Sequence, residues 1–158
     1  MFEINEIDAL SRIGQLKING KELITPNLIP VVHPFEKIFL PRELKELGAN
    51  AIFTNSYIIY QNIDLREKVL NQKIHGFLDY DGLVATDSGA FQQYMYDKSI
   101  PIDPQKIESF QEDIGSDMPV ILDVPVQIDD NYEKAKAKVI KTIDRAKANI
   151  ERRKNKDC

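Results

Sequence analysis

Two apolar runs in the sequence each end abruptly in an aspartate. In GLVATDSGAF (residues 82–91) the run leads into Asp87 and Ser88, at a turn that contains Gly89. In MPVILDVP (residues 118–125) an apolar run leads directly into Asp123. Either carboxylate alone could be a turn residue or a strand terminator. Two carboxylates in equivalent places indicate one shared site, and one reading of such a pair is a Mg²⁺ site in an α/β enzyme.

Turn signals and apolar runs divide the chain into alternating elements. Asn19-Gly20, between two alternating segments, predicts a type I′ β-hairpin at the N-terminus. Strands are predicted over residues 27–32, 50–56, 82–87 and 119–123, and helices over residues 41–48, 64–72, 103–115 and 132–156. The apolar runs are continuous rather than alternating, which favours a parallel sheet covered by helices on both faces.

We therefore expect an α/β fold in which ligands bind at the carboxyl ends of the strands. His33, Asn55, Asp87 and Asp123 follow the four predicted strands and should meet at one rim. His33 precedes a proline and could be only a loop residue, and Asn55 could simply satisfy loop backbone groups. The joint placement of Asp87 and Asp123 is what favours a functional reading.

Composition excludes several classes of protein. The chain has 158 residues and a formal net charge of −4, so no global charge marks a nucleic-acid binder. Its one cysteine, Cys158, allows no internal disulfide and no local cysteine metal cluster. No apolar run reaches the roughly 20 residues of a membrane helix. We expect no membrane association and a cytoplasmic location.

The predicted C-terminal helix is strongly basic. Residues 132–156 contain ten Lys or Arg and three Asp or Glu. Apolar residues recur in it every three to four positions, as in an amphipathic helix. The basic side chains could be a solvated outer face, or they could face phosphate groups.

Four motifs resemble, in their order and spacing, those of the tRNA-guanine transglycosylases. They are LITPNLIPVVHP (residues 23–34), TNSYIIY (residues 54–60), TDSGAFQ (residues 86–92) and VILDVP (residues 120–125). The likeness is to the archaeal branch and runs over almost the whole chain. It implies a pentosyltransferase that replaces a guanine in the tRNA D-loop by 7-cyano-7-deazaguanine (preQ0) during archaeosine synthesis. Retention of configuration in that exchange implies a covalent glycosyl intermediate.

The resemblance also implies residue roles. Asp87 matches the catalytic aspartate, as nucleophile at ribose C1′ or as general acid/base. Asp123 matches the aspartate that accepts hydrogen bonds from the base, Phe91 matches a stacking aromatic, and Ser88 and Gln92 would line the same pocket. Against the Mg²⁺ alternative, no phosphate-binding glycine loop is present. A module that binds tRNA or a deazaguanine without turnover remains an alternative.

The resemblance finally implies incompleteness. The family domain is a (βα)8 barrel of roughly 250 residues, whereas residues 1–26 form a hairpin region and residues 27–158 hold about four βα units, as a single domain. We expect half a TIM-type barrel that needs a C-terminal half chain or self-association. No metal ligands or cofactor are expected in this chain, and a zinc site is expected in the missing half.

Overall fold

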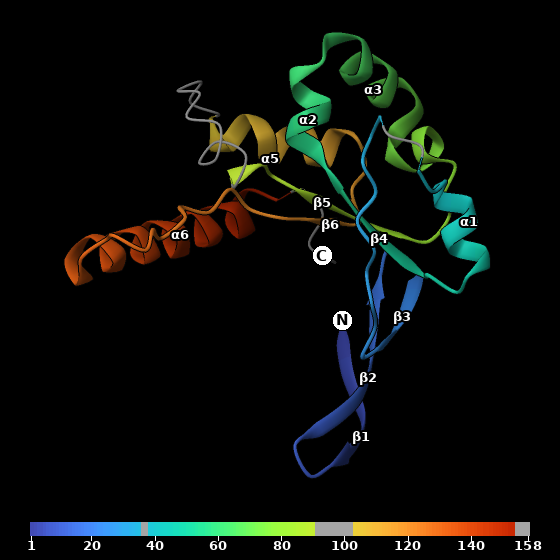
Figure 1. Cartoon of the computed structure of the whole chain (residues 1–158), viewed down its shortest axis with the longest axis horizontal. Coiled ribbons are helices and arrows are strands. Elements are labelled where there is room, and N and C mark those ends of the chain that lie inside the picture. Colours follow the sequence, from blue (N-terminus) through green and yellow to red (C-terminus); the bar gives the residue numbers. More distant parts are fainter. Residues whose placement is uncertain (36–37, 91–102, 154–158) are drawn as a thin grey trace.

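The N-terminus forms an antiparallel sheet that projects from the rest of the chain (Figure 1). The structure, a computed structural model, describes residues 1–35, 38–90 and 103–153. Strands β1 (Phe2–Asp8), β2 (Ser11–Ile18) and β3 (Lys21–Thr25) pair in that order. The predicted hairpin between β2 and β3 is confirmed, because Asn19 and Gly20 have the positive φ angles (51° and 75°) of a type I′ turn. Strand β1 was not predicted.

The central sheet is parallel. It contains β4 (Ala51–Asn55), β5 (Leu83–Asp87) and β6 (Met118–Pro119) in the order β4-β5-β6. Val31 forms one parallel bridge with Phe53 at the other edge of β4. Neighbours therefore follow one another in sequence, as in successive βα units. Within the described ranges the strands do not close into a barrel.

Two predicted strands were wrong in extent. Residues 27–32 contribute only the Val31 bridge, since Pro30 has no N–H to continue a ladder. The strand predicted over residues 119–123 ends at Pro119, and Val120 makes the last backbone hydrogen bond to β5, from its N–H to the Thr86 carbonyl (3.0 Å). The apolar run beyond it is nevertheless buried at Leu122, so burial there does not indicate a strand.

Helices lie between the strands and after the last of them (Figure 1). They are α1 (Pro41–Glu46), α2 (Ser56–Gln61), α3 (Ile63–Leu78), α5 (Pro104–Asp113) and α6 (Tyr132–Arg152). The predicted start of α5 is confirmed: the Asp103 carboxylate accepts the Gln105 N–H (2.9 Å) and Pro104 is the first helical residue. Helix α2 was not predicted. Among the described helices, none has the length and apolarity needed to cross a membrane.

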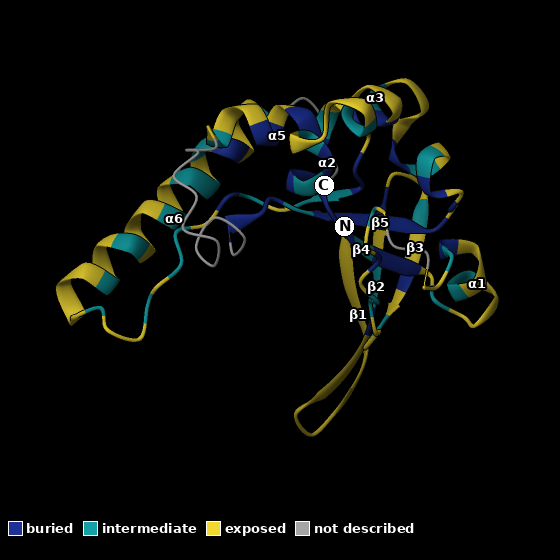
Figure 2. Ribbon diagram, turned by 45° about the horizontal axis from the view of Figure 1, so that its top comes forward, coloured by how far each residue is buried: buried dark blue, intermediate teal, exposed yellow. Residues whose placement is uncertain are grey.

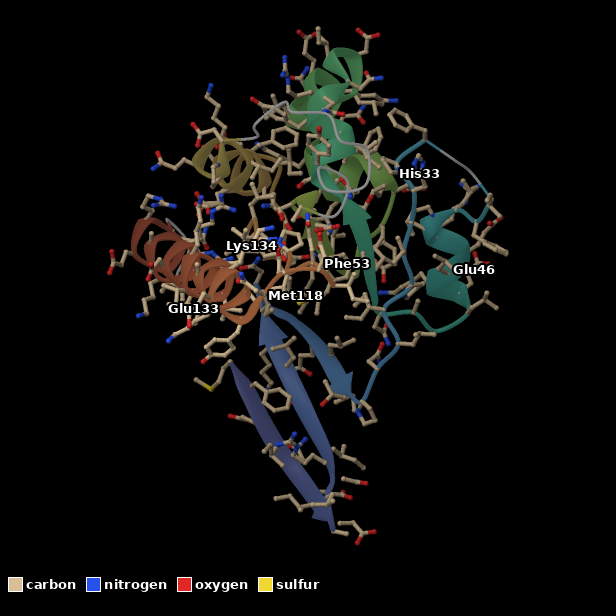
Figure 3. All side chains as sticks on the ribbon, turned by 60° about the vertical axis from the view of Figure 1, so that its left-hand side comes forward. His33, Glu46, Phe53, Met118, Glu133 and Lys134 are labelled. Atoms are coloured by element: carbon tan, nitrogen blue, oxygen red, sulfur yellow. The ribbon has the colours of Figure 1, made fainter. Side chains whose placement is uncertain are left out.

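Side chains of β4 and β5 alternate between two apolar clusters. Ile52 and Val84 pack with residues of α2, α3 and α5, whereas Ala51 and Leu83 pack with Ile18 and other residues of the N-terminal sheet. Figure 2 shows both strands buried and the outer part of the β1–β2 hairpin exposed, and Figure 3 shows Met118 where that hairpin meets the sheet. Because the side-chain period is two, Asn55 and Asp87 lie on the face opposite α3 and α5.

A buried carboxylate joins the two sheets. One Asp117 oxygen lies 3.0 Å from the Lys21 ammonium and 2.9 Å from both the Val84 N–H and the His75 ring nitrogen. The other accepts the Asn19 amide (3.1 Å). Burial by itself would raise the pKa of Asp117, but the hydrogen bonds from His75, Val84, Asn19 and Lys21 outweigh it and hold the pKa well below its usual range.

We predict that Asp117→Asn destabilises the fold by about 3 kcal/mol at pH 7, because the new amide donors face Val84 N–H and Lys21. A carboxylate whose pKa is lowered in the folded state stabilises it above the unfolded-state pKa, and this contribution declines as pH falls below about 4. Urea denaturation should therefore show a smaller difference between wild type and variant at pH 3 than at pH 7. A difference independent of pH would contradict this. Asp81→Asn, which removes an exposed partner of Lys45, is the control and should cost much less.

Candidate active site

The register of β4 and β5 places Asp87 directly opposite Asn55 at the carboxyl ends of the two strands. The Asn55 side-chain oxygen caps α2 by accepting the Ile58 N–H (2.9 Å), so its amide nitrogen faces Asp87, 3.4 Å from one carboxylate oxygen. The Gly89 N–H lies 3.4 Å from the other oxygen. Both distances exceed the usual N–H···O range, so the carboxylate is held weakly and keeps acceptor capacity for a ligand.

Hydroxyl groups fix the backbone around Asp87. The Ser56 hydroxyl donates to the Asp87 carbonyl (2.6 Å), and the fully buried Ser88 hydroxyl donates to the Ile121 carbonyl (2.9 Å). The Thr86 hydroxyl donates to the Gln111 side-chain oxygen (2.7 Å) and lies 2.8 Å from the Ser116 hydroxyl, which can donate to it. In this structure Ser88 thus holds the segment that precedes Asp123, and its predicted place in the base pocket stays a prediction.

Asp87 faces a cavity of about 410 Å³ on the side of the sheet opposite α3 and α5. The polar residues that line it are His33, Asn55, Asp87 and Thr54, and its other walls are the apolar residues Val31, Val32, Pro34, Phe53, Ile58 and Val120. Figure 3 shows His33 on the chain that leads from β4's edge towards α1, and Phe53 on the sheet. A carboxylate at the end of a mostly apolar cavity is a common form of ligand site.

Asp123 does not line this cavity. It lies four residues beyond β6, in a segment without regular secondary structure, and its side chain is exposed. Phe91 and Gln92 lie outside the described residues. The structure thus places Asp87 beside Asn55, and His33 lines the same cavity. The segment that carries Asp123 is linked to Ser88 by the hydrogen bond to the Ile121 carbonyl. Among the described residues, no group of three His, Cys, Asp or Glu side chains could hold a metal ion.

Several basic side chains of α6 form ion pairs or hydrogen bonds with other residues of the chain. Lys134 and Lys138 pair with Asp130, and Arg152 pairs with Glu108. Arg145 donates to main-chain carbonyls. Hydrogen bonds from Lys134, Lys138 and the Gln127 N–H hold the pKa of Asp130 well below its usual range. A phosphate-facing role for the remaining lysines of α6 stays a prediction.

The sequence is similar to those of known tRNA-modifying enzymes. The sequence model of the family described as "Queuine tRNA-ribosyltransferase" matches residues 8–158. The chain therefore belongs to this family of tRNA-guanine transglycosylases.

The chain is also similar to curated archaeal proteins that are named as tRNA-guanine transglycosylases. The tRNA-guanine(15) transglycosylase of Pyrococcus furiosus is 47% identical over 146 residues, which are 92% of this chain and 25% of that protein. The proteins of the same name from Nanoarchaeum equitans and Methanopyrus kandleri are 42% and 40% identical over 150 residues, which are 95% of this chain and 35% and 32% of those proteins. The chain thus spans a quarter to a third of the length of these relatives.

We predict that Gly89→Ala loosens the turn that carries Asp87. Gly89 has a φ of +85°, and a Cβ there would lie 2.3 Å from the Tyr57 Cβ. Gly48 has a similar φ of +94°, and a Cβ added there would have no neighbour within 4 Å, so Gly48→Ala measures the cost of the backbone angle alone. The excess destabilisation of Gly89→Ala should be roughly 1–3 kcal/mol by urea denaturation, the cost of overpacking. Equal losses in the two variants would show that Tyr57 does not confine the turn.

Proposed function

We propose that this chain supplies the Asp87 side of the active site of an archaeal tRNA-guanine transglycosylase, as part of a TIM-type barrel. The observation that carries the proposal is the loosely held Asp87 carboxylate, which lies at a strand end, beside Asn55, and faces a cavity. The family supports base exchange in tRNA, and the names of the archaeal relatives support guanine 15 as the base that leaves. We take 7-cyano-7-deazaguanine as the entering base.

The exchange requires one bond to break and one to form at ribose C1′, twice. In the first step a carboxylate oxygen bonds to C1′ while the bond from C1′ to guanine breaks and the base leaves with a proton. In the second step the entering base loses its ring proton and bonds to C1′ as the carboxylate departs. Asp87 either attacks C1′ or carries the proton. Its long contacts to Asn55 and Gly89 favour direct attack, because neither neutralises the carboxylate.

Asp123 would select the base. A carboxylate can accept from both the ring N1–H and the exocyclic amino group of guanine, and 7-cyano-7-deazaguanine presents the same two donors. One pocket can thus serve the leaving and the entering base. Phe91 would stack on that base, with Gln92 and Ser88 beside it.

The remaining barrel strands would cover the exposed face and edges of the sheet. Val31 and Val120, which line the Asp87 cavity, are 81% and 37% exposed. Open parallel edges and exposed apolar surface favour association with further strands. We propose that a C-terminal half, rather than self-association, provides them together with the zinc site, because the relatives are three to four times as long as the matched segment.

We predict that the chain alone does not exchange bases, whereas the completed enzyme does. The completed enzyme is this chain joined to the part of the Pyrococcus furiosus relative that it does not cover. In it, Asp87→Ala should lower incorporation of labelled guanine into unmodified tRNA by roughly a thousandfold or more. Stability should change little, since the carboxylate faces a cavity and supports no core packing. Exchange by Asp87→Ala at the wild-type level would overturn the catalytic role and favour a module that binds tRNA or a deazaguanine.

The same variant separates the two roles of Asp87. If Asp87 is the nucleophile, no covalent adduct between tRNA and Asp87→Ala should survive a denaturing gel. If Asp87 carries the proton, another carboxylate should still form a slow adduct.

We predict that Asp123→Asn weakens binding of 7-cyano-7-deazaguanine to the completed enzyme by roughly 2–4 kcal/mol, because one acceptor oxygen becomes a donor that faces donors of the base. Isothermal titration with the base alone measures this without turnover. Affinity equal to that of the wild type would show that Asp123 only terminates its segment.

A further inference from the structure

The segment that carries Asp123 is held by side chains instead of by the sheet. Beyond Val120, the backbone makes no further strand pairing to β5 within the described chain. The Ile121 carbonyl accepts the Ser88 hydroxyl, and the Leu122 and Asp123 carbonyls both accept the same Arg145 nitrogen, Nη1, at 2.8 and 3.2 Å. The Val124 N–H donates to the Thr142 hydroxyl oxygen (3.0 Å).

Arg145 and Thr142 form one clamp on helix α6. They are three residues apart, so their side chains lie on the same face of the helix. The Thr142 hydroxyl donates its proton to the Lys138 carbonyl (3.0 Å), which leaves a lone pair for the Val124 N–H. The guanidinium has no acceptor and can only donate, which suits two adjacent carbonyls. The two side chains therefore hydrogen-bond to the backbone immediately before and after the Asp123 side chain.

Little else in the described structure fixes Asp123. Its side chain is exposed, and the residue after Val124 is a proline, which has no N–H. Leu122 is buried and anchors the segment on the side of the helical core. The direction in which the Asp123 carboxylate projects thus depends on the Leu122 anchor and on the clamp from α6.

We propose that Arg145 and Thr142 are positioning residues that set the Asp123 carboxylate for two-point recognition of the purine-like base. This inference rests on the proposed function of Asp123. Two parallel hydrogen bonds tolerate little rotation or translation of the carboxylate, and a misplacement of about 1 Å in such a constellation can cost on the order of a hundredfold. Neither positioning residue contacts the base in this role.

The test uses Arg145→Met and Thr142→Val in the completed enzyme, which remove the donors and the acceptor with little change in bulk. Each should raise the KM for 7-cyano-7-deazaguanine by roughly tenfold or more and leave the KM for tRNA unchanged. Arg145→Lys, whose ammonium can still donate to both carbonyls, and Thr142→Ser, which keeps the hydroxyl, should recover most of the lost affinity. Lys141→Met is the matched control, because Lys141 is an exposed cation of the same helix that hydrogen-bonds none of residues 121–124.

A second measurement reads the clamp directly. Hydrogen exchange of the Val124 amide, followed by mass spectrometry, should be slow in the wild type and in Thr142→Ser and fast in Thr142→Val. A KM for the base that stays at the wild-type value in Arg145→Met and Thr142→Val, while Asp123→Asn raises it, overturns the inference and leaves the proposed function intact. A base affinity that Asp123→Asn does not change overturns the proposed role of Asp123 and the inference with it. Parallel rises in both KM values would show a merely structural role and also overturn the inference.

Discussion

The parallel pairing of β4 with β5 is the constraint on which the candidate site depends. Its register sets Ala51 against Leu83 at one end and Asn55 against Asp87 at the other. The first pair is fixed by burial against the N-terminal sheet, so the second pair follows four residues later on the same face. A slip of one residue would turn Asp87 towards the helices, where Thr86 now hydrogen-bonds the buried Gln111 and Ser116 side chains. The apolar contacts at the base of the sheet therefore determine the polar geometry at its rim.

Asp117 also holds this end of the sheet in place. Its carboxylate accepts from Lys21 and Asn19 of the β2–β3 hairpin and from the Val84 N–H of β5, and it contacts His75 of α3. A buried carboxylate with this many donors satisfies several elements at once, so it fixes their relative position more sharply than apolar packing can. The β1–β2 hairpin projects away from the parallel sheet (Figure 1), but the turn between β2 and β3 is in this way tied to the strand that carries Asp87.

Two kinds of element could be predicted from the sequence: strands that are buried on both faces, and turns whose residue types favour one turn conformation. Strands β4 and β5 are buried on both faces, and Asn19-Gly20 adopts the turn that its residue types favour. Strand β1 escaped prediction because all its residues are exposed. Helix α2 was hidden in an apolar run that continues from β4, although Asn55 at its start is a typical N-cap.

The site was predictable only in part, for a related reason. The Asp87 strand end could be located from its own residues. The contact with Asn55 depends on the register between two strands, and the contacts of Arg145 and Thr142 depend on the docking of a helix some 20 residues further along; a single sequence contains neither. The prolines at positions 30 and 119 stop the outer strands early, which explains why Asp123 follows an irregular segment and not a strand.

Side chains of α6 make hydrogen bonds to that irregular segment. Residues 119–130 run antiparallel to the helix, because Pro119 contacts Arg153, Leu122 contacts Arg145, and Val124 contacts Thr142. The helix is itself held at both ends, by Asp130 with Lys134 and Lys138 at its start and by Arg152 with the buried Glu108 of α5 near its end. Ser88 meets the same segment from the opposite side through the Ile121 carbonyl. The two carboxylates that the sequence singles out are therefore mechanically linked: Asp87 precedes the serine that holds Ile121, and Asp123 follows Ile121 by two residues. A shift of α6 would move the second carboxylate relative to the first, because the Arg145 and Thr142 side chains of this helix hold the backbone on both sides of Asp123.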